Sequence, residues 1–354
     1  MTASVYRGDG QVRFEDVPVP SIEAGEILVR VEACGICHTD LKKIEHDLLP
    51  APRIYGHETA GVVAAVGAGV TKFTIGDRVA LFHHIPCGDC FYCRHKDYAQ
   101  CPGYKKVGIT AGFEPAGGGF AQYVRVMPWI VEGGVEKIPD GVSFERGSFV
   151  EPVNTCLKGL EKLAIQPDET VLIQGQGPIG LIFTMLLRRA GVERLYATDR
   201  MPKRLAKACK LGAAEAWDPV ETDVAARLRE VTEGRGADVV IVAAHAPGIV
   251  EQACDVTRPG ARIMLFAQTS PQETFTLDGA QVGKGERMVF GSYSASVDLQ
   301  RESAETVWDP AFPIEELISD RLPLSELDRG IEIARRPGAG SLKVIVFPQR
   351  ENES

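Results

Sequence analysis

The sequence has few features that would place the protein in a membrane or on nucleic acid. Its start lacks the basic and apolar stretches of a secretory signal, and no later apolar run is long enough to cross a bilayer. Basic side chains are outnumbered, 39 against 48 acidic ones, and the formal net charge of -9 would repel a phosphate backbone. Internal repeats and low-complexity segments are also absent. We therefore expect a cytoplasmic protein that binds neither membranes nor nucleic acid.

What is present is typical of a folded protein with two domains. The chain has 354 residues, 44% apolar and 25% charged, which is enough to bury a sizeable core. Up to about residue 150, short alternating runs between Gly, Pro and Asp turns predict a β-rich domain. From about Glu169, strands and helices alternate, which predicts a parallel sheet covered by helices. The segment after about Gly291 ends in a strand, SLKVIVF, that could finish this sheet or return to the first domain.

A glycine-rich loop follows the first strand of the second domain. The loop has the spacing G-x-G-x-x-G, with Gly175, Gly177, Pro178, Ile179 and Gly180 as its marker residues. This spacing allows a tight turn and a close approach to a pyrophosphate at a helix N-terminus. We expect the helix to run from Pro178 to Ala190, followed by helices at Pro202–Lys210 and near Ile249–Thr257. Alone the motif is weak evidence, but a strand before it and a helix after it favour a dinucleotide site.

The next strand indicates which dinucleotide is bound. It ends in Asp199, 24 residues after Gly175, where a carboxylate can accept hydrogen bonds from the adenosine ribose hydroxyls. The same carboxylate would repel a 2′-phosphate, so NAD is favoured. Arg200 and Arg204 follow closely and could instead hold such a phosphate, which leaves NADP as the lesser alternative.

Four of the nine cysteines are clustered. Cys87, Cys90, Cys93 and Cys101 form C-x2-C-x2-C-x7-C in a stretch without apolar periodicity. Four thiolates at this spacing can complete a tetrahedral zinc shell that leaves no position for substrate, which predicts a structural zinc. Unligated thiols are disfavoured because the stretch has little core of its own. An iron–sulfur cluster is the lesser metal alternative.

A second set of metal-binding residue types is dispersed along the chain. It consists of Cys37 in CGICHTD, His57 and Glu58 in GHE, and Glu151 in VEP. One thiolate, one imidazole and carboxylates make a mixed shell that typically keeps a position for water or a substrate oxygen. Singly, each residue is weak evidence, since a histidine beside a glutamate is more often a surface pair. Their occurrence together with a dinucleotide loop and a cysteine cluster indicates a catalytic zinc.

Together these motifs resemble the zinc-dependent medium-chain alcohol dehydrogenase family over nearly the whole chain. The resemblance rests on the order CGICHTD, GHE, GDRV, the four cysteines, GGGFAQY, EP and GQGPIG. Glu151 stands where ordinary alcohol dehydrogenases place a second zinc cysteine, so the sequence is nearer to the sorbitol and threonine dehydrogenases. The implied fold is α/β, with a GroES-like β-rich catalytic domain at 1–152 and 292–354. A Rossmann NAD-binding domain at 153–291 would be inserted between its two parts.

The resemblance also implies residue roles and an assembly. Cys37 and His57 would bind zinc, Glu58 would be a close or exchanging ligand, and Glu151 would bind directly or through water. The family implies two zinc ions per chain, one in each site. Relatives on this branch are commonly tetramers and otherwise dimers, so a homo-oligomer is expected.

For proton transfer, the family assigns two roles in CGICHTD. Thr39 matches the hydroxyl that takes the substrate proton, and Asp40 the carboxylate that receives the N–H of the zinc-bound imidazole. Where many relatives carry a histidine three residues further on, this chain has Lys42. The end of the proton path therefore falls to Lys42, Lys43 or His46.

The implied reaction is hydride transfer between a secondary alcohol or polyol, or its ketone, and NAD. The substrate itself is not identified, although Phe113 and Glu114 are candidates for shaping its pocket. An amino-alcohol dehydrogenase, such as one acting on threonine, is an alternative. A zinc-free quinone or enoyl reductase would need neither the GHE pair nor the clustered cysteines, and a non-catalytic NAD-binding protein would not need Thr39.

Overall fold

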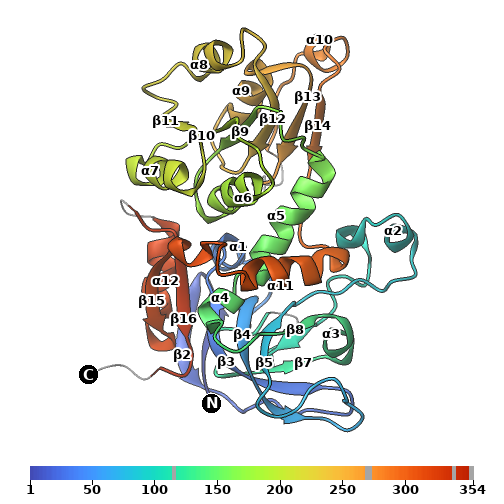
Figure 1. Ribbon diagram of the computed structural model, residues 1–354. Helices are drawn as coiled ribbons and strands as arrows, with labels where there is room; N and C mark the ends of the chain where they lie inside the picture. The colour runs from blue at the N-terminus through green and yellow to red at the C-terminus, as the bar shows by residue number, and fades with distance from the viewer. Residues whose placement is uncertain (114–116, 268–272, 337–339, 351–354) are drawn as a thin grey trace. The chain divides into compact units, whose positions relative to one another are not determined.

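The chain forms two units that are each built around one sheet (Figure 1). The computed structural model describes residues 1–113, 117–267, 273–336 and 340–350, so Glu114 lies outside the described residues. The first unit is Met1–Asn154 with Ala295–Ser354, and the second is Thr155–Ser294. Among the described residues, no helix is both long and apolar enough to cross a membrane.

The second unit is a parallel sheet of six strands in the order β11-β10-β9-β12-β13-β14. Its strands are β9 (Val171–Gln174), β10 (Leu195–Thr198), β11 (Glu215–Trp217), β12 (Ala237–Val242), β13 (Thr257–Leu265) and β14 (Met288–Gly291). Its helices are α6 (Pro178–Arg189), α7 (Pro202–Leu211), α8 (Val224–Val231), α9 (Ile249–Asp255) and α10 (Gly279–Val282). The order reverses between β9 and β12, and in such doubly wound sheets a ligand binds where the order reverses.

Apolar strands explain why this sheet is covered on both faces. All four residues of β9 and all four of β10 are buried, which is the pattern of a parallel strand with helices on either side. The predicted helices of this unit are confirmed, with ends close to the expected ones. The short elements β11 and α8, which were not predicted from the sequence, follow α7 in the chain, and β11 is an edge strand of the sheet.

The first unit is a largely antiparallel sheet of eight strands, with the path β15-β16-β3-β4-β5-β8 and β7 joining β3 to β6. Its strands are β3 (Ile27–Gly35), β4 (Glu58–Val66), β5 (Arg78–Leu81), β6 (Ile109–Thr110), β7 (Tyr123–Val126), β8 (Val135–Lys137), β15 (Ile318–Pro323) and β16 (Lys343–Phe347). A separate ribbon pairs β1 (Thr2–Gly8) with β2 (Gln11–Asp16). In β3 the alternate residues Ile27, Val29 and Val31 are buried while Arg30 is exposed, as a sheet with one face in the core requires.

Helices connect and cover these strands. They are α1 (His38–Glu45), α2 (Phe91–Arg94), α3 (Pro128–Gly133), α4 (Phe144–Gly147), α5 (Val150–Leu163), α11 (Gln300–Trp308) and α12 (Leu327–Arg335). Single 3-10 turns occur at η1 (Tyr98–Gln100), η2 (Val297–Leu299), η3 (Ile314–Leu317) and η4 (Leu324–Glu326). Helix α5 begins in the first unit and continues into the second.

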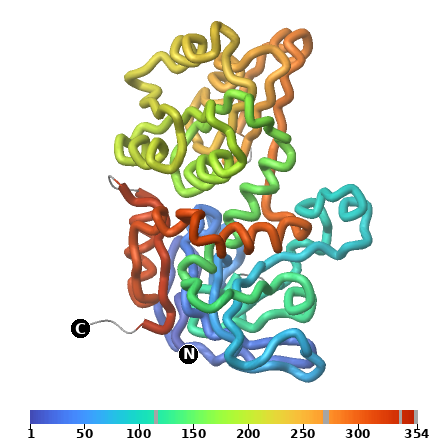
Figure 2. Tube along the Cα trace, viewed as in Figure 1, coloured from blue at the N-terminus to red at the C-terminus, as the bar shows by residue number. Residues whose placement is uncertain are grey.

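The sequence left open whether the last strand completes the sheet of the second unit or returns to the first unit, and the structure decides this. Strand β16 pairs antiparallel with β3 and parallel with β15, so the C-terminal segment returns to the first unit (Figure 2). Every residue of β16 is buried, including its first, Lys343. The return of this strand therefore places one lysine inside the core of the first unit.

Candidate active site and metal centres

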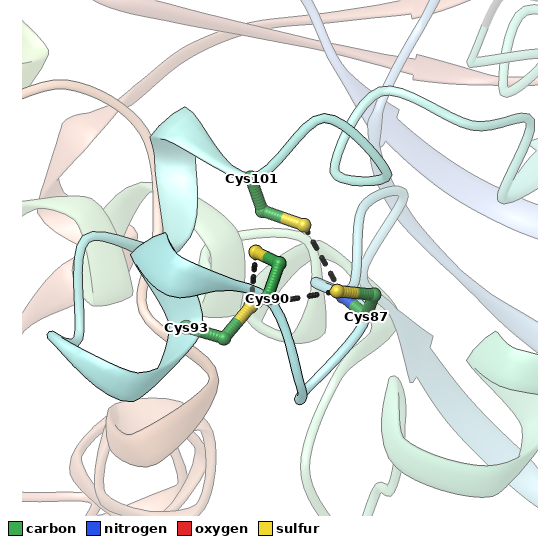
Figure 3. A group of neighbouring side chains, drawn as sticks. All are labelled: Cys87, Cys90, Cys93 and Cys101. Atoms are coloured by element: carbon green, nitrogen blue, oxygen red, sulfur yellow. Dashed lines mark hydrogen bonds between the residues drawn. The ribbon is translucent and has the colours of Figure 1, made fainter.

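The four clustered cysteines converge on one point (Figure 3). Their sulfur atoms all lie within 4.8 Å of one another, with 3.5 Å between the sulfurs of Cys90 and Cys93 and 3.8 Å between those of Cys87 and Cys93. The Sγ of Cys101 accepts a hydrogen bond from the backbone N–H of Cys87 at 3.4 Å. Four sulfur donors in this arrangement match the closed shell of a structural zinc.

The lobe that carries these cysteines has little else to hold it folded. Its buried cluster consists of Cys93, Cys101 and Tyr104, and two of these three are members of the sulfur group. Outside the lobe, the hydroxyl of Tyr98 donates to Asp298 at 2.9 Å, and the hydroxyl of Tyr104 donates to the carbonyl of Ala295 at 3.4 Å. Because so small a core cannot order a loop, metal binding fits as the main stabilising interaction of the lobe.

A second group of metal-binding atoms comprises Cys37, His57 and Glu58. One ligand atom from each lies within 4.8 Å of the others. Cys37 is the N-cap of α1, where its sulfur accepts from the backbone N–H of Thr39 at 3.5 Å. The side chain of Asp40 accepts from the N–H of Cys37 at 3.3 Å and completes a reciprocal cap. The sequence C-x-x-D therefore fixes the cysteine at the start of the helix.

The register of β3 with β4 brings His57 and Glu58 to this cysteine. Gly35 at the end of β3 lies opposite Glu58 at the start of β4, so the residues just beyond each strand meet. A Cβ atom at Gly35 would lie 2.0 Å from Oε2 of Glu58, so only glycine leaves room for this carboxylate. Gly56, before His57, has a φ of +91° and also packs against Phe120, which favours glycine in the GHE turn.

Asp40 orients the imidazole of His57. Oδ1 of Asp40 lies 3.0 Å from Nδ1 of His57, and both side chains are buried. Burial alone would raise the pKa of Asp40, but the facing His57 imidazole lowers it. Burial would likewise lower the pKa of His57, but Asp40 and the Cys37 sulfur raise it well above its usual value. The groups around His57, Asp40 and the Cys37 sulfur, therefore favour a positive charge. A bound metal ion would supply such a charge.

Glu58 has a cationic partner that was not predicted from the sequence. Nζ of Lys343 donates to both carboxylate oxygens, at 2.7 and 2.6 Å, and to the carbonyl of Ile36 at 3.3 Å. Both charged side chains are buried. Burial would lower the pKa of Lys343, but Glu58 and Cys37 raise it. In the sequence, the only local sign of this buried partner is that Lys343 begins the apolar run KVIVF.

Glu151 and Thr39 are predicted site residues that lie outside the group of Cys37, His57 and Glu58. Glu151 lies in the first turn of α5, is buried, and does not belong to the group whose ligand atoms lie within 4.8 Å. Burial raises its pKa to about 7, with Glu58 adding to the rise and His57 opposing it. Thr39 is half-buried in the first turn of α1. Of the candidates for the end of the proton path, Lys42 and Lys43 are half-buried and His46 is exposed at the end of that helix.

Two histidines beside this group were also missed. His83 and His84 follow β5, and the ring centroid of His83 lies 4.7 Å from that of His57 and 4.0 Å from that of His84. Burial is the first cause that lowers the pKa of His83 well below its usual value and that of His84 to about 3, and nearby cations add to it. Burial therefore favours the neutral form of both imidazoles. Their position directly before the cysteine cluster, in FHHIPC, was the available signal.

In the second unit, the glycine-rich loop has the backbone of a dinucleotide site. Gly175 has a φ of +97°, and a Cβ atom at Gly180 would lie 1.9 Å from the carbonyl oxygen of Gly175. Gly177 is the N-cap of α6 and Pro178 opens that helix, so the free N–H groups of its first turn are available to a pyrophosphate. Ile179 is half-buried in the same turn.

Asp199 is fixed against this loop from the neighbouring strand. One carboxylate oxygen accepts from the N–H of Gln176 at 2.7 Å and the other from the N–H of Met201 at 2.9 Å. A guanidinium nitrogen of Arg204 lies 3.9 Å from the same carboxylate, while Arg200 is exposed. Each oxygen keeps a further lone pair, so the carboxylate can still accept from ribose hydroxyls.

Comparisons with known proteins agree with this geometry. Residues 23–140 match the family model described as the alcohol dehydrogenase GroES-like domain, and residues 178–310 match the zinc-binding dehydrogenase model. The sorbitol dehydrogenase of Bacillus subtilis is 29% identical, covering 99% of this chain and 98% of that protein. The D-xylulose reductase A of Aspergillus oryzae is 30% identical over 83% of this chain and 84% of its own length. A solved zinc-binding dehydrogenase from Sinorhizobium meliloti 1021, bound to NADP, has a TM-score of 0.88 at 29% identity and covers 98% of this chain and 99% of its own.

Replacing one clustered cysteine should remove one metal ion. We expect Cys87→Ser to lower the zinc content of the purified protein from about two ions per chain to about one, and to lower the temperature of thermal unfolding. Elemental analysis and a thermal melt measure the two effects. Cys209→Ser is the matched control, because Cys209 is an exposed thiol outside both groups. Unchanged zinc content in Cys87→Ser would contradict the assignment.

Removing the cation that faces Glu58 should destabilise the metal-free protein. Lys343→Met leaves a buried carboxylate without its partner, and we expect a loss of about 3–5 kcal/mol in the free energy of unfolding. Zinc should restore part of this loss, because the metal ion replaces the ammonium group beside Glu58. Urea unfolding with a chelator and with added zinc measures both values.

The control for this variant is Lys72→Met. Lys72 pairs with Glu132 at 2.6 Å on the surface, and such exposed pairs contribute only about 0.2–1 kcal/mol. Equal losses in the two variants would show that the buried pair has no special role.

Proposed function

Because the chain belongs to the family of zinc-dependent alcohol dehydrogenases, we propose that it is an NAD-linked enzyme that oxidises a secondary alcohol or polyol, or reduces the corresponding ketone. Membership of this family makes the protein an oxidoreductase acting on CH–OH groups. The preference for a polyol is supported by similarity to proteins named sorbitol dehydrogenase and D-xylulose reductase. A substrate screen would have to show that the enzyme prefers a polyol to simple alcohols and to amino alcohols.

One observation carries the proposal. The ligand atoms of Cys37, His57 and Glu58 come within 4.8 Å of one another although they come from two separate segments of the chain. A mixed sulfur, nitrogen and oxygen donor set suits a catalytic zinc that keeps a position for substrate. We propose Glu151 as a fourth ligand, either directly or through water, because a buried carboxylate beside this group gains from a nearby cation.

The reaction requires a Lewis acid and a hydride acceptor. Zinc in this shell would supply the Lewis acid and the nicotinamide would supply the acceptor. The nicotinamide would accept a hydride from the carbinol carbon while the hydroxyl gives up its proton, so that the balanced products would be a ketone, reduced NAD and a proton. Oγ1 of Thr39 accepts this proton and passes it toward Lys42, Lys43 or His46.

The chain's own residues set the charge of the site. Asp40 holds the proton on Nδ1 of His57, so that the other ring nitrogen is available as a ligand. Lys343 balances the charge of Glu58, which leaves the Cys37 thiolate as the uncompensated negative donor of the group. A less negative shell leaves a bound metal ion more acidic toward an alcohol.

The second unit would hold the cofactor. The N–H groups at the start of α6 would bind the pyrophosphate, and Asp199 would accept from the adenosine ribose. The 2′-phosphate of NADP would meet the Asp199 carboxylate, which is already fixed by two backbone N–H groups and cannot turn away. Arg200 and Arg204 are the residues that would bind this phosphate if NADP were used.

We also propose that residues 1–152 and 292–354 act as the catalytic domain and residues 153–291 as the NAD-binding domain. A cytoplasmic homo-oligomer, either a tetramer or a dimer, completes the proposal. Its support is the resemblance to family members, and size-exclusion chromatography with light scattering would measure the assembly.

Removal of a zinc ligand should abolish the reaction without removing the cofactor. We expect Cys37→Ala and His57→Ala to lose turnover of every alcohol that the wild type oxidises, while NADH binding, followed by its fluorescence, persists. Cys209→Ala should retain turnover, since this thiol belongs to neither metal group. Near-normal turnover in Cys37→Ala would reject the assignment of the catalytic metal.

The carboxylate at the end of β10 should set the cofactor preference. In Asp199→Ala we expect the KM for NAD to rise far more than the KM for NADP, because a ribose acceptor is lost and a repulsive charge is removed. Initial rates with both cofactors measure this ratio. Glu193→Ala, at an exposed acidic residue of the same unit, should leave it unchanged. The same ratio in Asp199→Ala as in the wild type would remove Asp199 from the cofactor site.

A further inference from the structure

A row of four rings joins the cysteine lobe to the candidate catalytic metal group. It begins at Tyr104 in the lobe, whose ring centroid lies 5.3 Å from that of His84. The ring centroid of His84 lies 4.0 Å from that of His83, which in turn lies 4.7 Å from that of His57. All four residues belong to the first unit. Rings at such separations pack against one another, so the row connects the core of one metal-binding element with a proposed ligand of the other metal.

The two middle histidines are also tied to the backbone of the lobe. They lie on the chain that enters the lobe, just before its first cysteine, and Tyr104 lies on the chain that leaves it. His84 is hydrogen-bonded to the backbone of Lys106 on the leaving chain. A Cβ atom at Gly108 would lie 2.0 Å from the carbonyl oxygen of His83, so the two chains touch backbone to backbone. The position of the leaving chain therefore determines where the two histidine rings can lie.

The lobe is the part of this row that can change its state. Tyr104 is buried in the core of the lobe, whose other buried members are Cys93 and Cys101, two of the four sulfur donors. A metal ion held by these sulfurs fixes the packing around Tyr104, and so small a core cannot stay ordered without it. Two sites are coupled when both favour the same state of one such element.

We propose that Tyr104 is a positioning residue that couples the structural metal to the catalytic one. An ordered lobe holds Tyr104 against the two histidine rings, and these rings hold the imidazole of His57 in the orientation that binds the catalytic metal. This inference rests on the proposed function, which assigns a catalytic metal to the group that contains His57. Loss of the structural metal then weakens the binding of the catalytic metal, although the two ions have no ligand in common.

The row adds packing to an imidazole that Asp40 already orients. Asp40 fixes Nδ1 of His57 by a hydrogen bond, and the ring of His83 packs against the same imidazole. A ligand that is held in its binding orientation before the metal arrives loses less freedom on binding, so the complex is tighter. Removing the packing should therefore raise the Kd for the metal.

Loss of the structural metal is the first test. In Cys87→Ser we expect the remaining zinc ion to bind with a Kd at least about fivefold above that of the catalytic zinc in the wild type, the lower end of coupling between two sites. Zinc content over a series of buffered free zinc concentrations gives this Kd. Cys37→Ala, which should lack the catalytic ion, identifies its part of the wild-type curve. Cys209→Ser, at an exposed thiol outside both groups, should keep the wild-type Kd.

Changes within the row are the second test. Tyr104→Leu leaves all four cysteines in place and removes the ring, so the Kd for the catalytic zinc should rise. Tyr104→Phe keeps the ring and loses only the hydroxyl, and its Kd should stay near that of the wild type. Tyr92→Leu is the matched control, because Tyr92 is an exposed tyrosine of the same lobe whose ring packs against Phe91. His84→Ala breaks the row outside the lobe core and serves as the test if Tyr104→Leu does not fold.

A double variant tests whether the metal and the ring act through one path. Cys87→Ser combined with Tyr104→Leu should weaken the catalytic zinc no more than Cys87→Ser alone, because the row has then already lost its ordered end. Full additivity of the two changes would overturn the coupling through Tyr104.

The zinc measurements also separate this inference from the function on which it rests. An unchanged Kd for the catalytic zinc in Cys87→Ser, or in both Tyr104→Leu and His84→Ala, would overturn the inference and leave the catalytic metal standing. If Cys37→Ala kept both zinc ions, the assignment of the catalytic metal and the proposed function would fall, and this inference with them.

Discussion

Two of the three donors at the candidate metal site, His57 and Glu58, are buried, and each is held by a charged partner from another part of the first unit. Asp40 of α1 fixes His57, and Lys343 of β16 fixes Glu58. An unpaired buried charge costs several kcal/mol, so these two pairs are a condition for keeping the donors inside the protein. The site is therefore stable only when α1, β4 and β16 have all assembled, which couples metal binding to the fold of the whole unit.

Glycine residues, which have no side chain, make this close assembly possible. Gly35 leaves space for the Glu58 carboxylate, and Gly56 both turns the chain and packs against Phe120. The second unit uses the same device at Gly175 and Gly180, where strand, loop and helix approach more closely than a Cβ atom would allow. In the first unit glycine lets the backbone come near the Glu58 carboxylate, and in the second it gives the loop the close turn that the proposed binding of a pyrophosphate would need.

The features that could be predicted from the sequence are those whose residues lie close together both along the chain and in the folded structure. The cysteines from Cys87 to Cys101 lie within one short lobe, and the loop from Gly175 to Gly180 joins one strand to one helix, so a local pattern describes each of them. The grouping of Cys37 with His57 was only weakly indicated by the residues singly, and it was predicted from their occurrence together with the dinucleotide loop and the cysteine cluster and from the resemblance to a family. Lys343 was missed because it lies 285 positions from Glu58, and no local pattern reports a partner at that distance.

By itself, the sequence determined the alternation of strands and helices in the second unit, the turn chemistry of its glycines and the sulfur donors of the lobe, because these depend on neighbouring residues. The tertiary structure alone decided that the last strand joins the first unit, that Lys343 neutralises Glu58, and that the ring of His83 lies against that of His57. The reason is register: pairing of β3 with β4 and β16 selects which side chains meet, and a shift of one residue would turn each of them to the opposite face of the sheet.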